Sequence, residues 1–369
     1  MSVGIIGAGQ LGRMLALAAY PLGQRCLFLD RSADTPGGQI APSLVGEFTD
    51  PALLGDLLRQ SEVVTFDWEN ISVAALRAAL RMHQTRVAPP LKALEIAQDR
   101  LAEKRCFERL GIPTTRYRAV ASRAALVRAT EEIGLPGVLK TRRMGYDGKG
   151  QFTLRSSADI EAAWQALGGV PLLYEERIDF DFEVSALGVR SWSGDTATYP
   201  LSVNLHNAGI LRLTLAPGPQ GALARKARGY LLNLLRDFRY VGVLAIEFFV
   251  RKGRLIANEM APRVHNSGHW TIEGAATSQF ENHVRAILDL PLGSAAARGH
   301  SAMINLIGSV PPAAQLLDLP GVHLHDYGKE ARPGRKVGHC TIVAESAAAR
   351  DRLVRSFLRR VYPGLQSFP

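Results

Sequence analysis

Two glutamates on adjacent predicted strands are the side chains whose types and spacing best suit metal chemistry. Glu247 interrupts the otherwise apolar run VGVLAIEFFV, and Glu259 follows Asn258 in RLIANEM, with RKGR as the connecting turn. A carboxylate inside an apolar strand is costly unless it is paired or bound to a metal. Magnesium prefers one or two carboxylates, with water and substrate phosphate as its other ligands. The pattern therefore predicts a Mg²⁺ site, and ion pairs with arginines are the alternative.

The register of this hairpin decides whether the two carboxylates can meet. A two-residue turn at Lys252 and Gly253 places Glu247 opposite Asn258, whereas a three-residue turn places it opposite Glu259. The magnesium interpretation therefore requires the longer turn or a β-bulge.

A glycine-rich loop between two predicted strands has the composition of a phosphate-binding segment. In RRMGYDGKGQ, residues 142–151, the glycines let main-chain N–H groups approach a phosphate, and the basic residues add positive charge. Lys140 ends the preceding strand, where its ammonium can reach the same phosphate. The alternatives are an ordinary glycine hairpin and a lysine that only extends its stem over apolar surface.

A donor-rich segment follows the second glutamate directly. MAPRVHNSGHW contains Arg263, His265 and Asn266, which suit a substrate-binding loop beside a metal. Zinc binding by His265 and His269 is disfavoured, because Pro262 and Gly268 are poor neighbours for the helix that would align them.

A second basic loop lies near the C-terminus. KEARPGRKVGH gathers Lys329, Arg332, Arg335 and Lys336 around a Pro-Gly turn. Beside the other candidate sites, this segment resembles a phosphate clamp, and a solvated basic face is the alternative.

The N-terminal stretch VGIIGAGQLGRM raises a dinucleotide-binding hypothesis. Its G-x-G-x-x-G spacing runs from Gly7 to Gly12, and Asp30 ends the next predicted strand about eighteen residues later. These features are typical of a NAD-binding turn with an acid for the ribose. The same strand–turn–helix opens many α/β domains that bind no NAD, so the rest of the chain must decide.

Composition indicates a globular protein with small anionic partners. The 369 residues are 47% hydrophobic, and 44 basic minus 34 acidic residues give a net charge of +10. The basic residues are scattered without a long block, which favours phosphorylated substrates over nucleic acid. The three cysteines lie far apart, and we find no signal peptide or membrane-spanning run, so we expect a reduced, cytoplasmic protein without membrane association.

Hydrophobic periodicity divides the chain into three regions. Residues 1–97 alternate strand and helix, which predicts an α/β domain with a parallel sheet, and one helix is expected over 91–111. Residues 98–295 mix helices with short antiparallel strands in an α+β pattern, and residues 296–369 form a smaller C-terminal, β-rich region that ends in a helix.

These segments together resemble one family. In chain order, IIGAGQLGRM, QDRLAEK, GYDGKGQ, AIEFF, NEMAPRVHNSGHWT, MINLIG and RPGRKVGH are similar to the N5-carboxyaminoimidazole ribonucleotide synthetases. The resemblance implies an N-terminal pre-ATP-grasp domain, a two-lobed ATP-grasp domain with its lid lobe at about 112–175, and a C-terminal domain, as a homodimer. It implies that ATP and bicarbonate form carboxyphosphate, whose carboxyl group passes to the amine of 5-aminoimidazole ribonucleotide in purine biosynthesis.

The resemblance also assigns roles to individual residues. Glu247 and Glu259 match the Mg²⁺ ligands, and Arg263, His265 and Asn266 fit the place where carboxyphosphate forms. The positions that correspond to the ATP site are Arg100, Lys140, Gly145, Tyr146, Asp147, Gly148, Lys149, Gly150, Glu175, Glu176, Arg177, Ile178, Glu183, His206, Asn258 and Glu259. The positions that correspond to the ribonucleotide site are Gly9, Gln10, Leu11, Tyr146, Asp147, Lys329, Arg335 and Lys336.

Three other functions remain as alternatives. The hypothesis of a NAD-dependent dehydrogenase accounts only for the pattern in residues 3–30. Another ATP-grasp ligase or carboxylase with a different amine substrate shares the ATP site, although NSGHWT and RPGRKVGH argue against it. A nucleic-acid binder is suggested only by the net charge.

Overall fold

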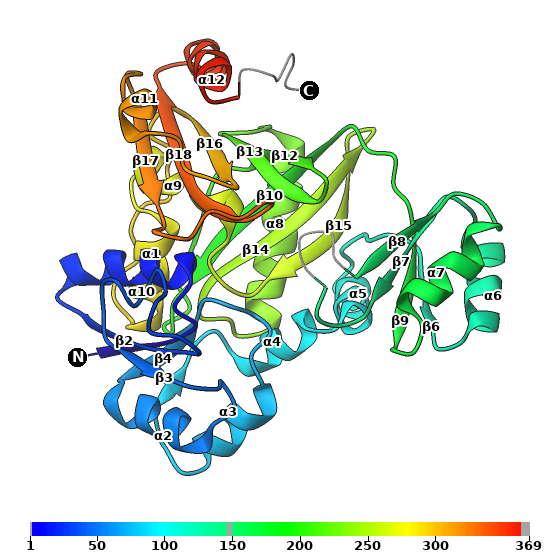
Figure 1. Cartoon of the computed structure of the whole chain (residues 1–369), viewed down its shortest axis with the longest axis horizontal. Coiled ribbons are helices and arrows are strands. Elements are labelled where there is room, and N and C mark those ends of the chain that lie inside the picture. Colours follow the sequence, from blue (N-terminus) through cyan, green and yellow to red (C-terminus); the bar gives the residue numbers. More distant parts are fainter. Residues whose placement is uncertain (1, 146–149, 363–369) are drawn as a thin grey trace.

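The N-terminal region folds around a parallel sheet, as its alternating pattern predicts. The computed structural model describes residues 2–145 and 150–362 (Figure 1). The five strands are ordered β3-β2-β1-β4-β5 and run parallel. They are β1 (Ser2–Ile6), β2 (Arg25–Asp30), β3 (Ser43–Val45), β4 (Val63–Phe66) and β5 (Arg86–Val87), with helices α1 (Gln10–Ala19), α2 (Pro51–Gln60) and α3 (Val73–Leu80) and the short η1 (Tyr20–Leu22).

The helix expected over 91–111 is interrupted, so that prediction is wrong in part. The structure has α4 (Leu91–Ala97) and α5 (Arg100–Arg109) instead. Asp99 between them is extended, and its Oδ1 accepts a hydrogen bond from the Leu101 N–H at 3.0 Å. This N-cap satisfies a helix terminus and starts α5 in a new direction, which places Arg100 at the first turn of a helix that faces the centre of the molecule.

A small lobe stands apart from the rest of the molecule (Figure 1). Its antiparallel sheet has the order β6-β9-β7-β8 and comprises β6 (Tyr117–Val120), β7 (Gly137–Thr141), β8 (Gln151–Leu154) and β9 (Leu172–Glu176). Helices α6 (Arg123–Ile133) and α7 (Asp159–Leu167) cover one face of it. These elements occupy the range expected for the lid lobe.

The largest sheet has nine strands and continues from the middle of the chain into its C-terminal part. Its order is β15-β14-β10-β12-β13-β16-β18-β17, with β11 paired to β10. The strands are β10 (Phe182–Arg190), β11 (Thr196–Thr198), β12 (Ser202–Asn207), β13 (Ile210–Ala216), β14 (Gly242–Arg251), β15 (Arg254–Ala261), β16 (His300–Ile307), β17 (Val322–Asp326) and β18 (Lys336–Ala344). The β13–β16 pairing therefore crosses residue 295 within one sheet.

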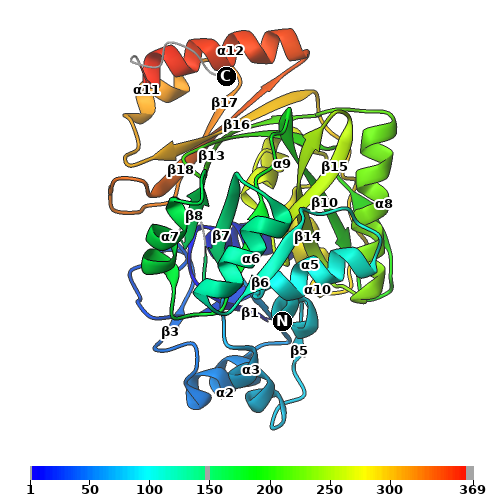
Figure 2. The ribbon, with the colours of Figure 1, turned by 90° about the vertical axis from the view of Figure 1, so that its right-hand side faces the viewer.

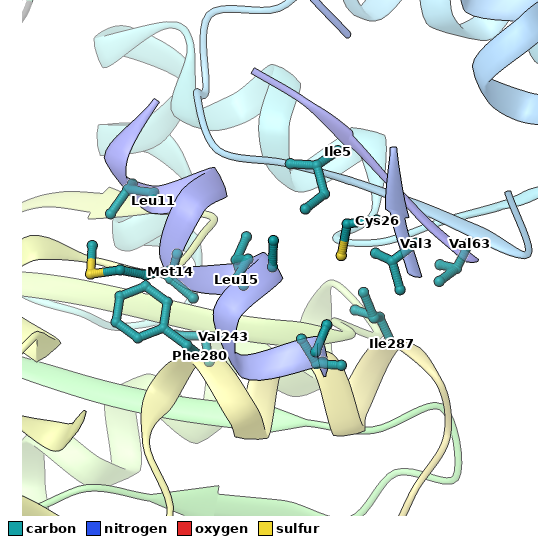
Figure 3. Packing of buried hydrophobic residues seen from close by; sticks show 14 of the residues in the cluster. Val3, Ile5, Leu11, Met14, Leu15, Cys26, Val63, Val243, Phe280 and Ile287 are labelled. Carbon is teal, nitrogen blue, oxygen red and sulfur yellow. The ribbon is translucent and has the colours of Figure 1, made fainter. Parts of the chain in front are cut away.

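Helices cover this sheet and join it to the N-terminal region. They are α8 (Ala222–Asp237), η2 (Asn266–Gly268), α9 (Thr271–Gly274), α10 (Gln279–Ile287), α11 (Ala313–Leu317) and α12 (Ala347–Val361), the last lying over β16 and β18 (Figure 2). Figure 3 shows α1 packed on α10, with Leu11 and Met14 near Phe280. Within the residues that the structure describes, none of the helices is long and apolar enough to cross a membrane.

Candidate active site

The hairpin β14–β15 brings the two predicted metal ligands together. Glu247 lies directly opposite Glu259, and the register shifts by a bulge between Glu247 and Phe248. The turn is the shorter one, because Arg251 pairs with Arg254 and only Lys252 and Gly253, both with positive φ, stand between them. The bulge therefore supplies the register that the magnesium interpretation requires.

The environment of this pair favours a bound cation. Burial raises the pKa of Glu247 to about 7, since His206 offsets it only in part while Glu259 and Glu183 raise it further. Arg100 Nη1 lies 3.3 Å from Glu259 Oε2 and supplies positive charge. His265 Nε2 lies 3.8 Å from Glu247 Oε1, but burial lowers the pKa of His265 well below its usual value and favours the neutral imidazole. Two adjacent carboxylates with a hydrogen-bonding surround match the hard oxygen ligands of Mg²⁺. Among the residues described, no group of three or more acidic, histidine or cysteine side chains is arranged to hold a metal ion by itself, so phosphate and water would complete the shell.

A buried ion cluster connects α5 to the small lobe beside this pair. Glu175 on β9 lies 3.4 Å from both Lys104 Nζ and Lys140 Nζ, and Thr115 Oγ1 donates to it at 2.9 Å. Burial alone would raise the pKa of Glu175, but Lys104, Lys140 and Arg100 outweigh burial and lower it to about 2. Burial lowers the pKa of Lys140. The cluster holds the Lys140 ammonium of β7 beside Glu175 and close to Lys104 of α5.

A histidine–glutamate pair lines the neighbouring strands of the large sheet. His206 Nδ1 on β12 lies 2.6 Å from Glu183 Oε2 on β10. Burial opposes the charged imidazole, yet the hydrogen bond to Glu183 and the nearby Glu247 raise the pKa of His206 overall. A second register shift, between Leu205 and His206, turns this side chain toward the acidic centre.

The donor-rich loop after β15 is held from several sides. Arg263 forms a bidentate ion pair with Glu69, with Nη2 3.0 Å from Oε1. Asn266 exchanges two side-chain amide hydrogen bonds with Asn305 of β16, at 3.1 and 2.7 Å. The loop thus presents its polar groups in a defined arrangement next to Glu247.

The N-terminal and C-terminal parts of the predicted phosphate site lie side by side, although Gln10 and Lys329 are 319 positions apart in the sequence. Lys329 Nζ donates to Gln10 Oε1 at the N-terminus of α1. Burial, together with Arg335 and Lys336, lowers the pKa of Lys329 to about 8. A helix N-terminus beside clustered cations is an arrangement suited to a phosphate.

The glycine turn at residues 7–12 is occupied by protein carboxylates. Asp67 Oδ2 accepts from Gly9 N at 2.7 Å and from Gly12 N at 3.2 Å, and Asp30 Oδ2 accepts from Ala8 N at 2.7 Å. A dinucleotide pyrophosphate needs these same amides, and two carboxylates repel it. Asp30, which the dinucleotide hypothesis gave to a ribose, is used within the turn.

Comparison with known proteins gives one answer over the whole chain. Residues 1–98 match the ribonucleotide synthetase preATP-grasp domain, residues 105–280 the ATP-grasp domain, and residues 301–352 the phosphoribosylaminoimidazole carboxylase C-terminal domain. A curated relative from Pseudomonas aeruginosa, N5-carboxyaminoimidazole ribonucleotide synthase, is 49% identical over 93% of this chain and 94% of its own.

Comparison with solved structures leads to the same family. The N5-carboxyaminoimidazole ribonucleotide synthetase of Thermus thermophilus has a TM-score of 0.94 at 49% identity, covering 99% of this chain and 100% of that one. The Aspergillus clavatus synthase in complex with ADP and 5-aminoimidazole ribonucleotide has a TM-score of 0.91 at 31% identity, covering 98% of both chains. The chain belongs to the N5-carboxyaminoimidazole ribonucleotide synthase family. The predicted fold class is thereby confirmed, and the protein is an ATP-dependent ligase of the ATP-grasp type.

Within this family framework, five of the predicted site residues lie close together. Arg100, Glu183, His206, Glu247 and Glu259 meet around the hairpin, as their contacts show. Tyr146, Asp147, Gly148 and Lys149 lie outside the described residues, while their neighbours Gly145 and Gly150 are described.

At some predicted positions the side chain is engaged within the protein. The Glu176 side chain pairs with Arg116 at 2.9 Å, and the Leu11 side chain is buried in the core against α10. Arg142, expected to add charge to the glycine loop, donates from Nε to Asp99 Oδ1 at 2.9 Å and so secures the start of α5 instead.

Two acids with evident roles in the site were missed by sequence reasoning. Glu69 pairs with Arg263, and Asp67 fills the glycine turn. Both lie in TFDWEN directly after β4, where the carboxyl end of a parallel strand commonly places functional side chains. That position was the one available signal.

Proposed function

We propose that this protein uses ATP and bicarbonate to carboxylate the exocyclic amine of 5-aminoimidazole ribonucleotide. The product is N5-carboxyaminoimidazole ribonucleotide, an intermediate of purine biosynthesis. The observation that carries the proposal is the Glu247–Glu259 pair, set by its bulge between the ATP-grasp cleft and the loop of Arg263, His265 and Asn266. The names of relatives that match end to end support the same reaction.

ATP is assigned to the cleft between the small lobe and the large sheet. The main chain of 175–178 receives the adenine, Glu183 with its partner His206 receives the ribose hydroxyls, and Arg100 and Lys140 neutralise the phosphates. Glu247 and Glu259 would hold Mg²⁺, with Asn258 beside them, and the ion would offset charge on the phosphates during phosphoryl transfer. Gly145 and Gly150 are the described ends of the glycine-rich segment that the resemblance assigns to ATP, and residues 146–149 lie outside the described residues.

Carboxyl transfer proceeds in two steps. A bicarbonate oxygen attacks the γ-phosphorus of ATP, the bond to ADP breaks, and carboxyphosphate forms beside Arg263, His265 and Asn266. The amine nitrogen of the ribonucleotide then attacks the carboxyl carbon, inorganic phosphate leaves, and the nitrogen loses a proton. Because carboxyphosphate hydrolyses in water, a closed and desolvated site is needed for the second step.

The ribonucleotide phosphate is assigned to the N-terminus of α1 and the basic loop before β18. Gln10 and Leu11 contribute main-chain groups, and Lys329, Arg335 and Lys336 contribute positive charge. The N–H of Gly9, also predicted to contact the substrate, donates to Asp67 Oδ2 instead. The homodimer is proposed from the family resemblance, and the cytoplasmic location is proposed from the three widely separated cysteines, which suit a reduced protein.

The test measures ADP release with Mg-ATP and bicarbonate, with and without 5-aminoimidazole ribonucleotide. We expect strong stimulation by the nucleotide. Glycinamide ribonucleotide and biotin, supplied in parallel, test the alternative that another amine is the substrate. Stimulation by either of these instead would discard the substrate but keep the ligase, and an absence of ATP turnover under all conditions would overturn the proposal.

A further inference from the structure

The fully buried amide of Gln279 forms a closed pair of hydrogen bonds with the main chain of one loop residue. Gln279 is the first residue of α10 and is 0% exposed. Its Oε1 accepts from His265 N at 2.9 Å, and its Nε2 donates to His265 O at 2.6 Å. The Gln279 side chain therefore satisfies both main-chain hydrogen-bonding groups of His265, as a neighbouring strand does for a residue in a sheet.

Gln279 is itself held on a rigid element. Its N–H donates to Thr271 Oγ1 at 2.9 Å, and Thr271 Oγ1 donates to Gly268 O at 2.6 Å. The following residue, Phe280, anchors α10 in the core against α1 (Figure 3). The helix that carries the amide is thus fixed in the core, and Thr271 connects its first residue to Gly268 of the loop.

The donor-rich loop packs tightly against the Gln279 amide. A Cβ at Gly268 would lie 2.6 Å from Gln279 Oε1 and 2.3 Å from Leu187 Cδ2, so a larger residue at this position would displace one or both side chains. The His265 side chain, held on the same backbone, has Nε2 3.8 Å from Glu247 Oε1 and Nδ1 2.8 Å from Ser267 Oγ. The direction of the imidazole is therefore set by a backbone that Gln279 fixes.

We propose that Gln279 is a positioning residue, which holds the His265 main chain so that its imidazole faces the site of carboxyphosphate formation. The role given to His265 rests on the proposed function. Small displacements of a reacting group reduce rates steeply, and functional side chains need support from packed, hydrogen-bonded neighbours. The loss of Gln279 also leaves the N–H and C=O of His265 without their buried partners.

Asn282 on the same helix provides a matched control. Its buried amide makes the same kind of ring with Gly293, accepting from Gly293 N at 2.8 Å and donating to Gly293 O at 3.1 Å. Asn282→Leu and Gln279→Met both remove a buried amide that holds a loop backbone, and only the second loop carries His265. Gln279→Glu is a second test variant, which keeps an acceptor for His265 N but removes the donor to His265 O.

The experiment combines hydrogen exchange with kinetics on the full-length protein. In Gln279→Met we expect the His265 amide to exchange at least about tenfold faster, kcat to fall about 10- to 100-fold, and KM for ATP to stay within about twofold. We also expect more than one ADP for each ribonucleotide carboxylated, because carboxyphosphate escapes. Gln279→Glu should lie between Gln279→Met and the wild type.

Asn282→Leu separates positioning from a general loss of stability. It should change exchange around Gly293 while leaving His265 protection and the ADP-to-product ratio at wild-type values. Equal uncoupling in Asn282→Leu, or unchanged exchange at His265 in both Gln279 variants, overturns the proposal. Wild-type ADP release that ignores the ribonucleotide refutes the proposed function instead, and the exchange comparison then decides on Gln279 by itself.

Discussion

Glu175 is the side chain whose replacement tests the electrostatics of the cleft most directly. It is 2% exposed and lies 3.4 Å from each of the Lys104 and Lys140 ammonium groups. Glu175→Gln keeps the shape of the side chain and removes its charge. Two buried ammonium groups then lose their shared counter-ion, which is the costly way to break a buried ion pair.

The expected loss of unfolding free energy follows from the pKa of the Glu175 carboxyl group. A drop from the ordinary value of 4.5 to about 2 corresponds to about 3 kcal/mol in favour of the ionised, folded form. Burial lowers the pKa of Lys140, which shows that desolvation offsets part of the attraction, so we expect a loss of about 2–3 kcal/mol. Because the folded pKa is depressed, this stability is present above pH 4.5 and is lost as the pH falls toward 2.

The assay is urea unfolding of wild type, Glu175→Gln and the control Glu176→Gln. Glu176 is the next residue but pairs with Arg116 at the surface, so its replacement should cost at most about 1 kcal/mol. The gap between wild type and Glu175→Gln should shrink by about 1 kcal/mol at pH 4, where the unfolded carboxyl begins to protonate. Equal losses in the two variants at pH 7, or a gap that grows at pH 4, would refute the reasoning.

Three other predictions concern the site. Glu259→Gln should lower ribonucleotide-stimulated ADP release at least about 100-fold. The control Glu132→Gln, which removes an exposed acid paired with Arg118, should leave this ADP release unchanged. An active Glu259→Gln variant would contradict the metal role. The kcat/KM for the ribonucleotide should fall above pH 8 as Lys329 loses its proton, and Lys329→Arg should flatten that decline; an unchanged profile in the variant would remove Lys329 from the phosphate site. NADH fluorescence should not change on titration with the protein, because Asp67 and Asp30 occupy the turn amides, and saturable binding would revive the dinucleotide hypothesis.

Sequence patterns could predict the strands of the metal hairpin but not their register. The alternation around Glu247 and Glu259 is equally consistent with two turn lengths, which set different partners opposite Glu247. The structure combines the short turn with a bulge after Glu247. The extra residue of the bulge is Asn258 on β15, because Glu247 pairs with Glu259 and Phe248 pairs with Ala257. A single asparagine in a strand does not by itself indicate a bulge.

The helix break and the missed acids have a different cause. The break at Asp99 was readable in principle, since aspartate is a good N-cap, but the apolar periodicity of 91–111 continues across it. Glu69 and Asp67 gain their roles only from partners far along the chain, at Arg263 and in the glycine turn. Periodicity describes neighbours in sequence and cannot report such contacts.

The way the donor-rich loop is held indicates that the site exists only in the complete fold. Arg263 is paired by Glu69 after β4 of the N-terminal sheet, and His265 by Gln279 of α10. Asn266 is paired by Asn305 on β16, beyond the point where the large sheet passes into the C-terminal region. Three successive polar positions thus take their geometry from three separate parts of the chain. Because carboxyphosphate must be made and used before water reaches it, a loop whose parts cannot move independently suits the proposed reaction better than a flexible one.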